Sequence, residues 1–180
     1  MDVERERELE SEIPSREKQE PWIYAHSSHE RDDIFNDYEK VGKWLLFFNN
    51  EHKSDVTGLT HLDSAWLSIK KLVENDIIYH AKCSTALKGI SEVYDKRQNG
   101  VICCYTPDYT NKQDVKRVAD AIRKEVHCLS NLFYKTDNDT RAGKYKHNGN
   151  NSVCIYKHTP KGELYERDPV FKHRWNLVNA

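Results

Sequence analysis

Strand-like and helix-like patterns of hydrophobic residues alternate along the chain, and each change between them marks the boundary of an expected element. Residues 43–49 are apolar at neighbouring positions, which is typical of a central strand in a sheet covered by helices. Apolar residues then recur at spacings of three and four, which predicts an amphipathic helix capped at its start by Asp63 or Ser64. Residues 77–83 return to a strand pattern, so the first half predicts a strand, a helix and a second strand.

The second half of the chain follows the same order. Residues 101–105 form a short apolar strand that ends before Pro107, and a helix with one apolar face begins at Thr110 or Asn111. Further strands are expected at residues 132–136 and 152–157, a polar loop at 137–151, and short strand or loop structure at 159–180. This order of elements predicts an α+β domain, with a curved, mostly antiparallel sheet and helices packed on one face.

The charged residues change this picture at the N-terminus. Residues 1–20 alternate Glu and Arg with few apolar side chains, so we expect a disordered arm there and a single domain over residues 21–180. This segment has no apolar run typical of a secretory signal, so we expect an intracellular location, cytoplasmic or nuclear. Over the 180 residues, 28 basic and 29 acidic side chains nearly cancel, so only a local basic patch could attract nucleic acid. No apolar run approaches the roughly 20 residues that span a bilayer, so no membrane partner is expected.

The five cysteines are an odd number, and most lie in apolar strand or helix patterns, which favours buried free thiols. No spacing of cysteine and histidine suits a zinc site. The acidic run that begins at Asp137 does not match the calcium-binding EF-hand loop, so no metal is expected. The chain has no phosphate loop, dinucleotide-binding glycine pattern or Ser-His-Asp arrangement, so we also expect no cofactor.

The strongest candidates for chemistry are His80 and Lys82, which lie two residues apart on an expected strand and therefore point to the same face. A lysine partly removed from water could act there as a base or bind a phosphate, and His80 could donate a proton to a leaving oxygen. The alternative is a solvated face, or one on which both residues bond to nearby acids. Cys83 would point to the opposite face and be buried.

A second candidate is the basic stretch that begins at Lys135 and continues with Arg141 and Lys144. Basic side chains that converge on a loop suit a phosphate ester, which arginine contacts through two N–H groups. The alternative is a solvated loop in which basic and acidic side chains offset one another. Trp22 lies outside the periodic elements and could stack on a base, whereas Trp44 is expected in the core.

Several short motifs occur in the order seen in the mRNA cap-binding translation initiation factor. They are Gly42–Leu45, Leu62–Trp66, Val101–Thr106, Val115–Arg123 and Phe133–Gly143. Together with Ala81–Lys82 and Tyr134–Asp137, the set more closely resembles the basophilic leukaemia-expressed (Bles) protein family, over about residues 42–156. This resemblance implies the fold of the cap-binding factor and assigns no biochemical activity.

The same resemblance bears on cap recognition, which requires two aromatic planes around a charged methylated guanine and a carboxylate on the edge of the base. The Trp-Glu pair that precedes the Gly-Lys-Trp strand in the factor has no counterpart in residues 32–37, and Tyr105 stands where a tryptophan is expected. Trp22 could supply one plane. The resemblance therefore implies a related ligand site without the usual form of cap recognition.

His80-x-Lys82 also resembles, in reversed order, the strand-borne Lys-x-His pair of the bacterial phosphothreonine lyases. The sequence thus leaves open whether the protein is an enzyme, and it supports three hypotheses. The first is a non-catalytic module for RNA or a nucleotide. Its candidate ligand contacts are Lys82, Lys135, Arg141, Lys144, Trp22 and Tyr105. The second is a lyase-like enzyme in which Lys82 abstracts a proton from a phosphopeptide and His80 protonates the leaving group. The third is a protein-interaction domain that uses its outer helix faces, with an unnamed protein partner.

Overall fold

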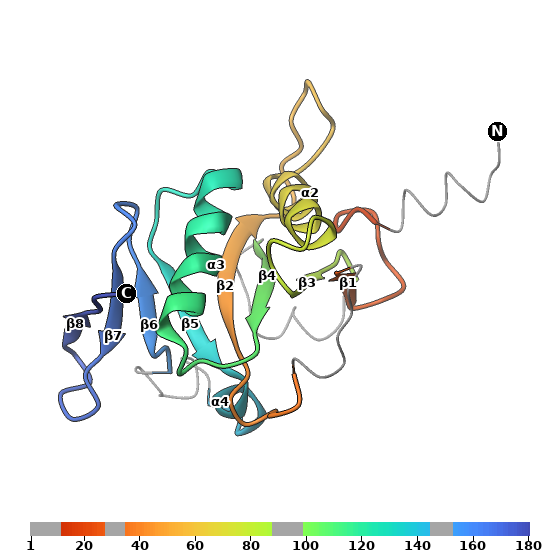
Figure 1. Cartoon of the computed structure of the whole chain (residues 1–180). Coiled ribbons are helices and arrows are strands. Elements are labelled where there is room, and N and C mark those ends of the chain that lie inside the picture. The colour runs from red at the N-terminus through yellow and green to blue at the C-terminus, as the bar shows by residue number, and fades with distance from the viewer. Residues whose placement is uncertain (1–11, 28–34, 88–98, 145–152) are drawn as a thin grey trace.

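The computed structural model describes residues 12–27, 35–87, 99–144 and 153–180, which form one eight-stranded antiparallel sheet and three helices (Figure 1). The strands lie in the order β1-β3-β4-β2-β5-β6-β7-β8. They are β1 (Trp22–His26), β2 (Gly42–Asn49), β3 (His80–Ser84), β4 (Asn99–Thr106), β5 (Leu132–Thr136), β6 (Tyr156–His158), β7 (Leu164–Arg167) and β8 (Trp175–Leu177). The helices are α2 (His61–Glu74), α3 (Lys112–Glu125) and the short α4 (Asp137–Arg141). The predicted α+β class is confirmed.

The two long helices, α2 and α3, lie side by side on one face of the sheet (Figure 1). Trp66 of α2 and Ile122 of α3 are buried there together with Trp44 of β2. The Trp44 indole Nε1 donates to the Val115 carbonyl over 3.0 Å, which links β2 directly to α3. Packing on a single face and the core position of Trp44 are therefore confirmed. None of the helices in the described ranges is long and apolar enough to cross a bilayer.

The start of each long helix depends on a polar cap. For α2 the cap is Thr60 and not Asp63 or Ser64, the two residues expected from the sequence. The Thr60 hydroxyl accepts from the Asp63 backbone N–H over 3.0 Å, and the Asp63 carboxylate accepts from the Thr60 N–H over 2.9 Å. This reciprocal pair satisfies two backbone donors that the helix leaves unpaired, so Asp63 belongs inside the first turn. For α3 the cap is Asn111, one of the two predicted residues.

The C-terminal strands differ in extent from the prediction. The strand expected at 152–157 is limited to Tyr156–His158 in β6, and the tail continues the sheet through β7 and β8. These strands are three or four residues long, so their alternation is too short to establish a period.

Residues 12–20 are described in the structure and contact α2, unlike the disordered arm expected over residues 1–20. Ile13 is buried, and the Trp66 indole Nε1 donates to the Glu12 carbonyl over 3.1 Å. The backbone N–H and the hydroxyl of Ser15 donate to the buried Asp63 carboxylate over 2.9 and 2.7 Å. A buried carboxylate needs such donors, so this segment is held by a residue about fifty positions away.

Candidate ligand-binding site

The face of the sheet turned away from α2 and α3 carries the side chains that alternate with the core residues. We call it the lysine face. Its strand residues are Trp22, Tyr24, His26, Lys43, Leu45, Phe47, Asn49, His80, Lys82, Ser84, Asn99, Val101, Cys103, Tyr105, Phe133, Lys135, Lys157, Tyr165, Arg167, Trp175 and Leu177. Among these strand residues five are Lys or Arg and none is Asp or Glu. The chain as a whole has a net charge of −1, so positive charge is concentrated on this face.

Tyr105 of β4 lies at the centre of a cluster on the lysine face. The antiparallel register places Tyr105 directly between His80 of β3 and Lys43 of β2. The Lys43 Nζ lies 5.2 Å and the Lys82 Nζ 6.0 Å from the centroid of the Tyr105 ring. The Lys82 Nζ also lies 4.2 Å from the centroid of Trp22. We call these five residues the Tyr105 cluster, and their rings and cations are close enough for cation–π attraction.

The structure brings together four of the residues that the sequence singled out: Trp22, His80, Lys82 and Tyr105. His80 and Lys82 share one face, as strand alternation predicts. Cys83 is buried on the opposite face, also as predicted, and burial raises the pKa of its thiol.

His80 is held in its neutral form. Burial, then the neighbouring His26 and Lys82, lower its pKa to about 4. The His26 ring centroid lies 4.6 Å from that of His80, and the Tyr105 ring centroid lies at 5.3 Å. At neutral pH the His80 imidazole therefore carries no extra proton, and a neutral imidazole is a poor acid. This environment gives no support to the predicted role of His80 as the acid that protonates a leaving group.

Lys43 and Lys135 are opposed across β2 and β5 and are almost fully buried, with exposed fractions of 5% and 3%. The Lys43 ammonium forms an ion pair with the Asp137 carboxylate. The Lys135 Nζ donates to the Lys144 carbonyl over 2.6 Å, and burial, followed by the charge of Lys43, lowers the Lys135 pKa. Buried lysines need such partners, so Lys43 is held in place within the Tyr105 cluster and Lys135 beside it.

Sequence reasoning did not select Lys43 as a site residue, because it lies within an apolar run. The signal that could have found it is strand alternation. Lys43, Leu45 and Phe47 occupy one face of β2, and Trp44 and Leu46 occupy the core face. A lysine at the start of such a strand lies either at a solvated edge or beside a partner, and the partner here is 94 residues further along the chain.

Arg141 and Lys144 are engaged around α4, which occupies the start of the segment that was expected to be a loop. The Arg141 Nη2 donates to the Tyr38 carbonyl over 2.7 Å and also to the Asn138 side chain. The Lys144 ammonium forms an ion pair with Asp139 over 2.7 Å. These contacts fit the alternative interpretation, in which the charges of this segment offset one another. Residues 145–152, the rest of the expected loop, lie outside the described residues.

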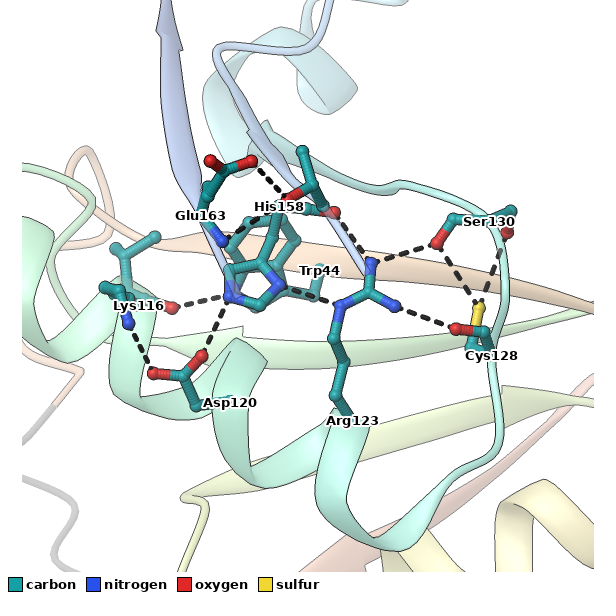
Figure 2. Close-up of polar contacts among 10 residues, drawn as sticks. Trp44, Lys116, Asp120, Arg123, Cys128, Ser130, His158 and Glu163 are labelled. Atoms are coloured by element: carbon teal, nitrogen blue, oxygen red, sulfur yellow. Dashed lines mark hydrogen bonds and ion pairs between the residues drawn. The ribbon is translucent and has the colours of Figure 1, made fainter. Parts of the chain in front are cut away.

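A separate polar network lies on the helix side of the sheet, around His158 of β6 (Figure 2). His158 is fully buried, its Nε2 lies 2.8 Å from the Asp120 carboxylate, and Arg123 lies on its other nitrogen. Asp120 is also paired with Lys116 over 2.7 Å. Both ring nitrogens are occupied and the ring has no exposure, so this His–Asp pair is a structural link between β6 and α3. In the described ranges, no group of three or more His, Cys, Asp or Glu residues is placed to hold a metal ion.

Comparison with solved structures defines the class of fold. The chain is similar to eIF4E-3 of C. elegans, solved as a complex with the 4E-binding protein Mextli and a cap analog, with a TM-score of 0.50, 18% identity and coverage of 78% of this chain and 77% of that one. It is also similar to eIF4E-3 of Ascaris suum, solved with an m2,2,7G cap, with a TM-score of 0.49, 14% identity and coverage of 75% and 73%. The match to the C. elegans structure shows an eIF4E-like fold, and an identity this low carries no more than the fold.

The family follows from the sequence match. A family model for the basophilic leukemia-expressed protein Bles03 matches residues 37–141, and the chain belongs to this family. The predicted resemblance to the Bles family and to the fold of the cap-binding factor is confirmed. The weaker likeness to phosphothreonine lyases stays a prediction.

Proposed function

We propose that this protein is a non-catalytic binding module for a phosphorylated ligand of the nucleotide class, RNA or a free nucleotide, held on the lysine face at the Tyr105 cluster. One observation carries the proposal. The Lys82 ammonium lies against the Trp22 and Tyr105 rings, and within the described residues it forms no ion pair with a carboxylate. A phosphate can bind such a cation without first displacing an internal acid.

The other members of the Tyr105 cluster suit the rest of a nucleotide. Trp22 and Tyr105 offer aromatic surfaces on which a base can stack, and such stacking is worth about 1–3 kcal/mol per base. Lys43 is almost fully buried and paired with Asp137, so Lys82 is the cation of the cluster that is available to a phosphate. Phosphate would thus be held at Lys82 and the base at the rings.

The charges around Tyr105 favour an unmethylated base. A methylated cap guanine is positively charged, and stacking it on Trp22 or Tyr105 would place it beside the Lys82 ammonium, which has no carboxylate partner among the described residues, whereas Lys43 is paired with Asp137. Like charges at this distance repel. The eIF4E structures that hold a cap have the same fold, but on these grounds we propose a ligand other than the methylated cap.

No specific observation favours either alternative hypothesis, the lyase or the protein-interaction domain. The lyase mechanism needs a proton donor, and the low pKa of His80, about 4, leaves the ring neutral. A protein partner on the outer faces of α2 and α3 stays a prediction, although the C. elegans relative was solved with a 4E-binding protein.

Calorimetric titration would test the proposal with guanosine triphosphate, an unmethylated guanosine cap dinucleotide and its methylated form. Lys82→Gln keeps the first two methylene groups of the stem and replaces the charged end with a neutral amide. Lys124→Gln removes an exposed charge from the helix side and is the matched control. We expect Lys82→Gln to weaken guanosine triphosphate binding about 10-fold or more, since a charge-assisted bond is worth about 1.5–3 kcal/mol, and Lys124→Gln to change nothing.

The same titrations at several salt concentrations complete the test. Binding should weaken steeply with salt for the wild type and less steeply for Lys82→Gln. The proposal fails if no ligand binds, or if the two variants behave alike. Much tighter binding of the methylated form than of the unmethylated form would overturn the argument from like charges.

A further inference from the structure

A second group of rings and cations lies on the lysine face, on β5 to β8. We call Phe133, Lys157, Tyr165, Arg167 and Trp175 the Trp175 cluster. The Arg167 guanidinium carbon lies 4.2 Å and the Lys157 Nζ 4.8 Å from the centroid of Trp175. The Lys157 Nζ is also 4.8 Å from the centroid of Tyr165, and the ring centroids of Phe133 and Trp175 are 6.2 Å apart. Like the Tyr105 cluster, it combines a tryptophan, a tyrosine and two cations, and it lies further along the same face of the sheet.

The cations of the Trp175 cluster have distinct roles. Arg167 is anchored to the backbone, because its Nε donates to the Cys154 carbonyl over 2.6 Å and its Nη1 donates to the Lys172 carbonyl. Lys157 contacts two rings and, in the part of the chain that the structure describes, forms no ion pair. Phe133 is 38% exposed, which is unusual for a large aromatic side chain in the middle of a sheet. An available cation beside an exposed ring is suited to a phosphate joined to a base.

The antiparallel register connects the two clusters in one row. Lys82, Cys103, Leu45, Phe133, Lys157 and Tyr165 are directly opposed on consecutive strands. Four strand spacings separate Lys82 from Lys157, which is roughly 19 Å. The side chains between them are apolar or weakly polar; Cys103 is buried at 4% exposure and Phe133 is 38% exposed. No strand residue of the lysine face is acidic, so a polyanion with planar bases that lies along the row would meet no acidic strand residue.

Building on the function proposed above, we propose that the lysine face binds a single strand of RNA that runs across the sheet. One end of the bound segment lies at the Tyr105 cluster and the other at the Trp175 cluster. At the stacked rise of about 3.4 Å per nucleotide, roughly six nucleotides span the distance, and fewer do so when the strand is extended. Rings on a sheet favour a single strand, since the bases of a duplex are stacked on one another and unavailable. An acidic peptide would satisfy the cations but would leave the rings without stacking partners.

Fluorescence anisotropy with labelled oligouridylates would test this inference on the full chain, using a trimer, a hexamer and a dodecamer. The variants are Trp175→Ala, Trp175→Phe and Lys157→Gln, with Lys124→Gln as the control. We expect the hexamer to bind at least 10-fold more tightly than the trimer, and the dodecamer to add little. Trp175→Ala and Lys157→Gln should each weaken hexamer binding roughly 5- to 100-fold, and Trp175→Phe should retain most of it.

Guanosine triphosphate separates this inference from the function on which it rests, because one molecule is too short to reach both clusters. The Trp175 and Lys157 variants should keep the part of guanosine triphosphate binding that Lys82→Gln removes, which also shows that they fold. If guanosine triphosphate binds through Lys82 but the hexamer gains nothing over the trimer, the inference fails and the proposed function stands. If neither guanosine triphosphate nor any RNA binds, the proposed function itself fails. Equal binding of duplex RNA, or equal competition by polyglutamate, would also overturn a stacked single strand.

Discussion

Arg123 donates its Nε–H to Nδ1 of the buried His158 over 2.9 Å (Figure 2). An arginine side chain can only donate hydrogen bonds. This bond therefore fixes the His158 tautomer with its proton on Nε2, directed at the Asp120 carboxylate 2.8 Å away. The same guanidinium donates to the carbonyls of Cys128, Ser130 and His158 over 2.8, 2.9 and 2.7 Å. One side chain thus connects α3, the chain before β5, and β6.

Replacing this arginine should destabilise the sheet beyond β2. In Arg123→Lys a compact ammonium replaces the planar fork, so several acceptors lose their donor. We expect the free energy of unfolding to fall by about 2–3 kcal/mol. Urea denaturation of the wild type and the variant would measure the loss. Lys124→Gln, one residue further along α3, should stay within about 0.5 kcal/mol. Equal stability of the two variants would show that the network contributes little.

The pH dependence of stability should report on His80. Its pKa is lowered to about 4 in the folded protein, mainly by burial, whereas in the unfolded chain it should lie near 6.5. Between these values the unfolded state binds a proton that the folded state does not, so the free energy of unfolding falls as the pH is lowered through this window. Allowing for partial solvent screening, the loss should be on the order of 2 kcal/mol between about pH 7 and pH 4.

Denaturation at a series of pH values, with wild type and His80→Gln in parallel, isolates this contribution. The variant should lose less stability than the wild type as the pH falls from about 6.5 to 4. His158, whose pKa is also lowered by burial, contributes in the same direction in both proteins and cancels in the difference. Parallel curves for the two proteins would contradict the assigned environment of His80.

The main features of the fold could be predicted from periodicity, because its elements are long enough to show one. The two long helices bury residues at the positions that their spacing predicts. β2, which was expected to be apolar on both faces, leaves Phe47 61% exposed on the face without helices. Strand alternation also placed His80 and Lys82 on one face. The missed features depend on tertiary partners. Lys43 is buried because Asp137 lies beside it, and residues 12–20 are held because Asp63 needs donors. No local sequence pattern encodes such partners. β8 is three residues long, which is too short to show a periodic pattern at all.

The structure predicts that the protein has no phosphothreonine lyase activity. Elimination from phosphothreonine needs a protonated group near the leaving phosphate, and neutral His80 does not supply one. We expect no release of inorganic phosphate from phosphothreonine peptides at neutral pH. Mass spectrometry would detect the loss of phosphate and the dehydroamino acid. Turnover that His80→Gln and Lys82→Gln both abolish would refute the non-catalytic assignment.

Gly42 is required by the close approach of Tyr134. A Cβ at this position would collide with the Tyr134 ring and hydroxyl, which is hydrogen-bonded to Thr106 in the core. Gly42→Ala should therefore lower the free energy of unfolding by about 1–3 kcal/mol, as overpacking does. Gly100→Ala should also be destabilising, because a Cβ there would meet Leu62, whose side chain is fully buried in the core. Thermal denaturation of Gly42→Ala beside the wild type should show the loss, and unchanged stability would contradict this account.

The N-terminal boundary of the folded unit can be tested by comparing two truncations. One lacks residues 1–11, and the other lacks residues 1–20. Only the second removes Ile13 from its buried position and takes away both Ser15 donors to the Asp63 carboxylate. A buried carboxylate that loses its donors is costly, so the second protein should be less stable than the first by about 2 kcal/mol or more. Ser15→Ala in the full chain, which removes the hydroxyl donor and keeps the backbone one, should fall between them. Identical melting temperatures for the two truncated proteins would instead support the expectation from the sequence that residues 1–20 form a disordered arm.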